Sequence, residues 1–137
     1  MNPKQVAEYM LNQDEFSKWM DIQLIEVKEN YCLIEMPIKK EMINGLKTVH
    51  GGVTFAFADS ALAFSSNNSG DAAVALNCII NFTKAGKEGD IFRAESVLVN
   101  STRKTAIYDI KITNQNEELV AKFVGTVYKI GKKVTEL

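Results

Sequence analysis

Residues 48–70 read TVHGGVTFAFADSALAFSSNNSG and constrain the fold more than any other stretch of the chain. They hold the chain's only histidine, a glycine pair and a single charged residue, Asp59. No proline interrupts them, and Asn68 and Gly70 are residue types that commonly end helices. We therefore predict a helix from Gly51 to Asn68, roughly 27 Å long at about 1.5 Å per residue.

The predicted helix is apolar on nearly every side. At about 100° per residue, Phe57 falls on one face, while Phe55 and Leu62 fall close to the opposite one. A helix of this kind is normally buried, and it needs more cover than one sheet provides. Asp59 has apolar neighbours one turn before and one turn after it, so its carboxylate has to be paired, neutralised or used in function.

Composition describes an ordinary globular chain and excludes several classes of partner. We expect one domain over residues 1–137, because 46% of the residues are apolar and 24% are charged. A net charge of −1 gives no reason to expect nucleic acid or a membrane surface as a partner. The polar, acidic start is unlike a signal peptide, and Cys32 and Cys78 sit in apolar strand-like runs, so we expect a cytoplasmic protein with reduced thiols. With one histidine and no clustered carboxylates, no metal site is expected.

The rest of the chain shows one helical segment and then alternation. Residues 2–20 have helical spacing, broken near residues 12–14, and we expect residues 1–20 to form a helical cap. Alternating apolar residues predict strands, the last of them in a meander, at 22–27, 31–38, 73–82, 91–100, 105–113 and 119–129. Period-two alternation places Val74 and Leu76 on the same face as Cys78. We predict an α+β fold in which an antiparallel sheet wraps around the long helix and a second subunit covers the remainder.

A chemical site is predicted at the start of the long helix. A helix N-terminus offers unpaired backbone N–H groups and partial positive charge, and Gly51 and Gly52 leave these groups open to a carbonyl that develops negative charge. Asp59 is the candidate base or nucleophile, acting on the carbonyl carbon directly or through water. His50 is expected to orient the loop, and Asn44 to offer its amide to a water or a substrate.

Distance argues against a site made by one chain. Asp59 lies about 10–12 Å along the helix axis from the glycines. Attacking and polarising groups each lie about 3 Å from a reacting carbonyl. An antiparallel helix of a second copy, related by a twofold axis, would place Asp59 of one chain beside Gly51 of the other. Catalysis is therefore expected at a dimer interface, with two equivalent sites.

Ordinary structural roles stay open for all of these residues. The glycine pair is equally a turn, the histidine a loop hydrogen-bonder, and the aspartate a buried pairing partner. Outside the helix, Lys84 and Arg103 are either solvated turn charges or phosphate contacts. Asn77 is most simply a polar position near an interface.

The combined pattern resembles a known family. The chain is similar to the hotdog-fold acyl-CoA thioesterases of the phenylacetate-degradation (PaaI-like) type in three motifs: Asn44-Gly-x-x-x-x-His50-Gly51-Gly52, Ala58-Asp59, and INFTKAGKEGD at residues 80–90. The resemblance covers residues 44–128. It implies a hotdog fold, in which an antiparallel sheet wraps around a long central helix, and a homodimer that often pairs into a homotetramer.

The resemblance also implies roles for individual residues. Asp59 takes the place of the family's base or nucleophile, and Gly51 supplies the N–H that polarises the thioester carbonyl. His50 and Asn44 take the supporting positions. Further substrate contacts are expected from apolar walls around the acyl group and from residues near CoA: Gly52, Phe55, Leu62, Asn77, Lys84 and Arg103. Some relatives carry Ser or Thr on the strand after the helix, and here Asn77 replaces that helper or the helper is absent.

We therefore expect an acyl-CoA thioesterase that converts a small or medium acyl-CoA or aryl-CoA and water into the free acid and CoA. CoA thioester is the substrate, and no cofactor is expected. Two alternatives remain open. One is an enoyl-thioester hydratase on the same fold, and the other is a non-catalytic acyl-CoA-binding or structural oligomer in which Asp59 only pairs with a neighbour.

Overall fold

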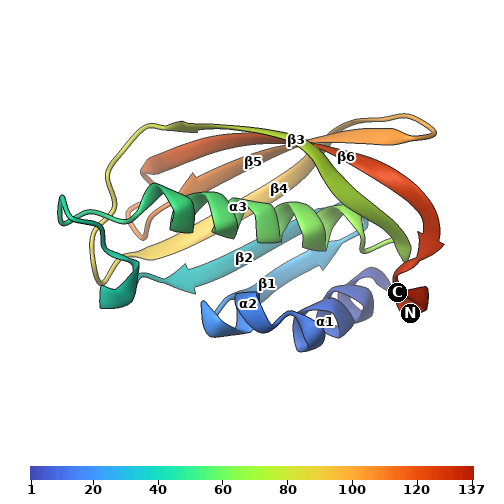
Figure 1. Ribbon diagram of the computed structural model, residues 1–137, viewed down its shortest axis with the longest axis horizontal. Coiled ribbons are helices and arrows are strands. Elements are labelled where there is room, and N and C mark those ends of the chain that lie inside the picture. The colour runs from blue at the N-terminus through green and yellow to red at the C-terminus, as the bar shows by residue number, and fades with distance from the viewer.

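The computed structural model describes residues 1–137 and shows one antiparallel sheet curled around a central helix (Figure 1). The sheet has six strands in the order β1-β2-β4-β5-β6-β3, and every neighbouring pair is antiparallel. This arrangement confirms the predicted α+β fold class. The elements are α1 Pro3–Gln13, α2 Glu15–Trp19, β1 Gln23–Lys28, β2 Tyr31–Pro37, η1 Lys40–Met42, α3 Gly51–Ser66, β3 Asp71–Phe82, β4 Ile91–Ser101, β5 Thr105–Thr113, β6 Leu119–Lys133 and η2 Val134–Glu136.

The central helix, α3, begins at its predicted first residue and ends at Ser66, slightly before the predicted end. It lies across the hollow of the sheet (Figure 1), and Phe57 and Phe64 on its sheet side are fully buried. On the other side Phe55 and Asp59 are exposed, so one chain leaves part of the helix uncovered. At 16 residues α3 is the longest helix, and no helix combines the length and apolarity needed to cross a bilayer.

All six predicted strands are present, with small differences at their ends. Pro37 ends β2, as expected for a residue that has no N–H to donate to a neighbouring strand. β6 continues to Lys133, beyond its predicted end at residue 129. The polar end of β6 stays extended because it still pairs with β3, through Asp71 and Lys133, after a bend at Gly131, where φ is 75°.

The position of β3 differs from the predicted meander. β4, β5 and β6 do follow one another, but β3 lies at the sheet edge beside β6 and not beside β4. The reason is that a strand has only two edges, and those of β4 are taken by β2 and β5. The chain therefore passes from β3 to β4 through a loop, residues 83–90, that rounds the end of the molecule near the start of α3 (Figure 1).

The prediction of which β3 side chains share a face of the sheet is also wrong, for the residues that precede Leu76. Leu76 has no partner on β6, so the register shifts there and the alternation changes phase. Cys78 pairs with Gly125, which faces α3. Val74 pairs with Tyr128, three residues further along β6, and therefore lies on the opposite face of the sheet.

The N-terminal residues form two short helices, with the break at Asp14, which caps α2. α1 packs beside β1, and its Val6 meets Ala72 of β3 and Val134 of the C-terminal segment in a small second core. Both ends of the chain therefore lie close together, at the edge formed by the first residues of β3 (Figure 1).

Candidate active site

The start of α3 opens into a pocket of about 390 Å³, which we call the α3 pocket. Its walls come from the segment before α3, the first turn of α3, the end of β3 with the loop that follows, and β6. The Phe82 ring closes one side, since a Cβ placed on Gly51 would lie 3.3 Å from the Phe82 Cζ atom. The lining residues are Thr48, Val49, Gly51, Thr54, Phe82, Thr83, Lys84, Ala85, Gly86 and Val120.

His50 caps α3 and leaves one amide without a partner. Its Nδ1 accepts a hydrogen bond from the Gly52 N–H at 2.9 Å, and its carbonyl accepts from Val53 and Thr54 at 2.9 and 3.3 Å. The Gly51 N–H donates to no acceptor in the chain. Of the four amides that have no i→i−4 partner at this helix start, Gly52 and Val53 donate to His50 and His50 donates to the Met42 carbonyl at 2.8 Å, so only the Gly51 N–H, on a residue that lines the α3 pocket, has no acceptor.

Asn44 organises the loop before α3. Its Oδ1 accepts hydrogen bonds from the backbone N–H groups of Leu46 and Thr48 at 2.9 and 3.1 Å and from the Thr48 hydroxyl at 3.2 Å. Its own N–H donates to the Thr48 carbonyl at 2.8 Å. The orienting role predicted for His50 thus falls partly on Asn44, while the Asn44 Nδ2 donates to no group of the protein and remains free for another acceptor.

Asp59 has no hydrogen bond or salt bridge to any residue of its own chain. Although the residue is exposed, the surrounding protein partly desolvates its carboxylate and raises its pKa, and the nearby Asp14 carboxylate raises that pKa further. On β3, burial and then the charge of Asp59 raise the pKa of the Cys78 thiol. A carboxylate that lacks a partner and has a raised pKa is a suitable proton acceptor.

The two predicted catalytic groups are separated in one chain. Asp59 does not line the α3 pocket, and it stands eight residues beyond Gly51, about 12 Å along the helix. Asp59 lies instead on the exposed side of α3 in a strip with Gly52 and Phe55, which we call the α3 strip. A single carbonyl cannot contact both groups of one chain, so the predicted dimer interface stays the way to bring them together.

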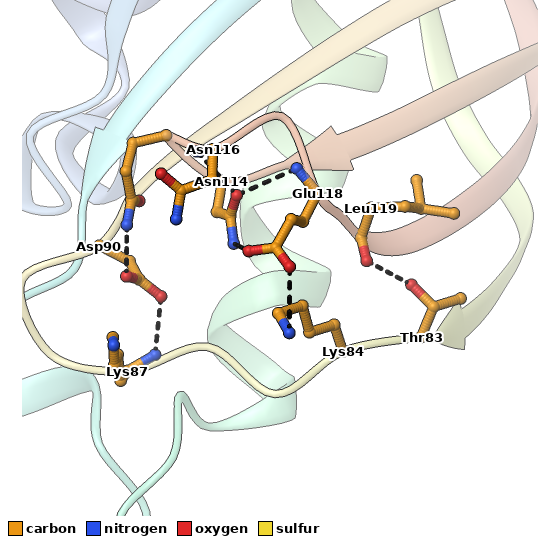
Figure 2. Close-up of polar contacts among 9 residues, drawn as sticks. Thr83, Lys84, Lys87, Asp90, Asn114, Asn116, Glu118 and Leu119 are labelled. Atoms are coloured by element: carbon orange, nitrogen blue, oxygen red, sulfur yellow. Dashed lines mark hydrogen bonds and ion pairs between the residues drawn. The ribbon is translucent and has the colours of Figure 1, made fainter.

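A set of polar contacts holds the loop after β3 against the turn between β5 and β6 (Figure 2). The Thr83 hydroxyl donates to the Leu119 carbonyl at 2.7 Å, and Lys84 Nζ lies 3.2 Å from Glu118 Oε2. The Asn114 amide donates to the other Glu118 oxygen at 3.1 Å, and the hydrogen bonds from Asn114 and Lys84 lower the pKa of Glu118. The turn therefore places the positive charge of Lys84 at the rim of the α3 pocket.

The predicted apolar walls have different surroundings. Phe55 is 36% exposed and packs edge-on against Phe123, with ring centroids 5.2 Å apart. Leu62 is only 1% exposed and faces Gly125 of β6. Leu62 therefore falls on the sheet side of α3 and belongs to the core of its own chain, and its contact with an acyl group stays a prediction.

The two remaining predicted contacts lie away from the α3 pocket. Asn77 pairs with Thr126, which follows Gly125 on β6, so the register places Asn77 on the sheet face that points away from α3. Arg103 stands in the exposed connection between β4 and β5, at the end of the molecule opposite the start of α3 (Figure 1), and it forms none of the salt bridges. Neither residue reaches the start of α3 in its own chain.

Several lining residues were missed from the sequence. Phe82 and Thr54 line the α3 pocket, and Glu118 holds Lys84 at its rim. Thr54 is one turn into the predicted helix and could have been found from helical spacing. Phe82 and Glu118 reach the site only because β3 lies beside β6, and no local pattern indicates that pairing.

A larger hollow of about 630 Å³ lies on the outer face of the sheet, away from α3. Charged side chains line much of it, among them Glu35, Arg93, Glu95 and Lys111. It contains none of the predicted site residues. No group of three or more His, Cys, Asp or Glu side chains is arranged to hold a metal ion.

Comparison with known proteins shows the family to which the chain belongs. Residues 46–121 match the thioesterase superfamily. The chain is 36% identical to the acyl-coenzyme A thioesterase PaaI of Escherichia coli K12 over 96% of this chain and 94% of that protein. The solved structure of E. coli PaaI superposes on it with a TM-score of 0.94 at 35% identity, covering 96% of this chain and 95% of that one. The chain therefore belongs to the thioesterase superfamily, as a PaaI-like thioesterase with the hotdog fold.

Two further relatives extend the comparison. A putative esterase of Archaeoglobus fulgidus is 37% identical over 94% of this chain and 84% of that protein. A Streptococcus mutans protein whose structure was determined bound to acetyl-CoA superposes with a TM-score of 0.79 at 28% identity, covering 82% of this chain and 90% of that one.

Proposed function

We propose that the chain hydrolyses an acyl-CoA thioester to the free acid and CoA at a site shared by two copies. Gly51 of one chain polarises the thioester carbonyl, and Asp59 of the other acts as base or nucleophile. The observation that carries the proposal is the pair of groups without partners, the Gly51 N–H in the α3 pocket and the Asp59 carboxylate on the α3 strip. The acyl-CoA thioesterase named among the relatives supports the substrate class.

The edge of the sheet supports a dimer. β3 is a 12-residue edge strand without cover, and Leu76 and Ile79 on it are 63% and 59% exposed. A long apolar edge strand has unpaired backbone N–H and C=O groups that can pair with a strand of another chain. Antiparallel pairing of β3 with its twofold copy would join two sheets and set two α3 helices side by side, along the α3 strip and the small residues Ala56 and Ala63. Association of two dimers into a homotetramer stays a prediction.

The chemistry follows from the two groups. The Gly51 N–H, at the positive end of α3, stabilises the oxygen that becomes negative when the carbonyl carbon is attacked. Either Asp59 takes a proton from the attacking water, or it attacks first and water then releases the acyl group. In both routes the C–S bond breaks, CoA leaves as a thiol after gaining a proton, and the acid departs.

The surroundings favour a particular orientation of the substrate. Lys84 lies at the rim of the α3 pocket and is proposed to contact a phosphate of CoA, and Phe55 is proposed as the apolar surface for a small or medium acyl or aryl group. His50 and Asn44 contribute by fixing the loop and the first turn of α3.

Thiol release from a panel of acyl-CoAs tests the proposal. Gly51→Pro removes the unpaired N–H and puts the ring Cδ in its place, and proline suits the first helical position because His50 has ψ of 130°, which tolerates a following proline. Gly51→Ala is the matched control, because it adds a similar Cβ and keeps the N–H. We expect the proline variant to be roughly 100- to 1,000-fold slower than the alanine variant.

Asp59→Ala is expected to abolish thiol release at every substrate concentration. Release that survives unchanged in Asp59→Ala would contradict the assigned role. Hydration of an enoyl-CoA without thiol release would indicate a hydratase instead, and tight acyl-CoA binding with no turnover would indicate a binding protein.

A further inference from the structure

A buried hydrogen-bond chain joins the N-terminal segment to the helix turn that carries Asp59. The Ser17 hydroxyl donates to Asp14 Oδ2 at 2.6 Å, and the Ser17 and Ser60 hydroxyl oxygens are 2.8 Å apart. Ser17 is 0% exposed and Ser60 7% exposed. Asp59 immediately precedes Ser60, so this series of hydrogen bonds ends one residue away from the proposed catalytic carboxylate.

The donor and the acceptor of each hydrogen bond in this series are fixed. A carboxylate only accepts, so the single Ser17 hydroxyl proton goes to Asp14, and Ser60 must donate to Ser17. The Ser17 N–H donates to the other Asp14 oxygen at 2.9 Å. Both Asp14 oxygens are therefore held, and the negative charge of Asp14 is kept in one place beside α3.

We propose that Asp14 is a positioning residue for Asp59, because the Ser17–Ser60 chain holds a second negative charge next to the proposed base and makes Asp59 a stronger proton acceptor. This inference rests on the proposed function of Asp59. It assigns a role in the reaction to the N-terminal segment, which otherwise looks like a structural cap.

The groups that face Asp59 agree with this role. From the link between α1 and α2 comes Asp14, and from β3 comes the half-buried thiol of Cys78. No lysine or arginine pairs with Asp59 to offset them. Desolvation is the larger cause of the raised pKa of Asp59, and the Asp14 charge is the additional one that a substitution can remove.

The experiment compares Asp14→Asn with Asp21→Asn. Asparagine keeps one oxygen to accept from the Ser17 N–H and so keeps the cap of α2, while its NH2 group replaces the second acceptor and donates to the Ser17 hydroxyl, and the charge is removed. Asp21→Asn removes one charge from the same segment at a site that pairs with Lys39. Asp59 is titrated by carbon-13 NMR of its carboxyl carbon, assigned by its absence in Asp59→Asn. We expect the midpoint to move to lower pH in Asp14→Asn only.

The pH profile of thiol release gives the second readout. Its acidic midpoint is expected to fall in Asp14→Asn, and by a smaller amount in Ser17→Ala, where Asp14 loses the hydroxyl hydrogen bond but keeps the one from the backbone N–H of residue 17. A purely structural role would lower kcat or stability and leave both midpoints unchanged, which would overturn the inference. Failure of the proposed function looks different, because the wild-type protein would then release no thiol, while the NMR titration would still decide the role of Asp14.

Discussion

Two polar groups of this chain stand out at the scale of single residues because they lack partners. Every other amide at the start of α3 has an acceptor within the chain, yet the Gly51 N–H has none. The chain has seven salt bridges, yet Asp59 takes part in none. Folded chains satisfy most such groups, so groups left open in a pocket and on a helix strip are available to a substrate or a second chain.

Asp59 is expected to reduce the stability of the folded chain near neutral pH. Its pKa is raised on folding, so its contribution to stability is complete below the ordinary Asp pKa of about 4 and is lost as pH rises through the folded value. We predict that Asp59→Asn unfolds at higher urea concentration than the wild type at pH 7, while it loses activity.

The comparison is made by urea denaturation between pH 3 and pH 8. The advantage of Asp59→Asn should shrink as the pH falls and be lost at the acidic end. Asp71→Asn is a useful control, because Asp71 pairs with Lys133. This variant should be as stable as the wild type at pH 7 or less stable. An Asp59→Asn variant that is less stable than the wild type at pH 7 would show that the carboxylate has a stabilising partner.

At the scale of elements, the contact between α3 and β6 depends on Gly125. A Cβ at this position would lie 2.7 and 2.9 Å from the two methyl carbons of Leu62, which is closer than atoms pack. We predict that Gly125→Ala lowers the free energy of unfolding by about 1–3 kcal/mol. Gly45→Ala is the matched control, since a Cβ there meets nothing within 4 Å. Equal unfolding midpoints for the two variants would contradict the tight packing of α3 on the sheet.

The loop after β3 gives a second prediction at this scale. Glu118 holds Lys84 at the rim of the α3 pocket, but its carboxylate would also compete with a CoA phosphate for the Lys84 ammonium group. If Lys84 meets a CoA phosphate, Glu118→Gln should lower KM for acyl-CoA and Lys84→Ala should raise it, with kcat nearly constant in both. The effect should weaken as salt is added. A KM that is the same in all three proteins would remove Lys84 from the substrate site.

The elements were largely predictable from the sequence, and their pairing was not. The alternation of polar and apolar residues located every strand, and the glycine pair located the first residue of α3. The unpaired Leu76 changed the phase of β3, and a period-two pattern carries no sign of a bulge. The place of β3 beside β6 depends on contacts between residues far apart in the chain, and so do the positions of Phe82 and Glu118 at the α3 pocket.

At the scale of the whole molecule, a single chain has an incomplete surface. β3 offers an unpaired edge, and the α3 strip leaves Phe55 and Asp59 uncovered on the same helix that the sheet buries from the other side. The sequence indicated this need for a second copy, because a helix apolar on every side exceeds what one sheet covers and because Asp59 stands too far from Gly51.

Mixing two inactive variants tests the shared site most directly. Gly51→Pro and Asp59→Ala chains are unfolded together, refolded and assayed for thiol release, with each variant refolded alone as the control. Random pairing gives mixed dimers in which one of the two sites has both natural groups, so we predict a return to about a quarter of the wild-type rate. Activity that stays at the level of the separate variants, in a mixture shown to contain mixed dimers, would contradict a site built from two chains.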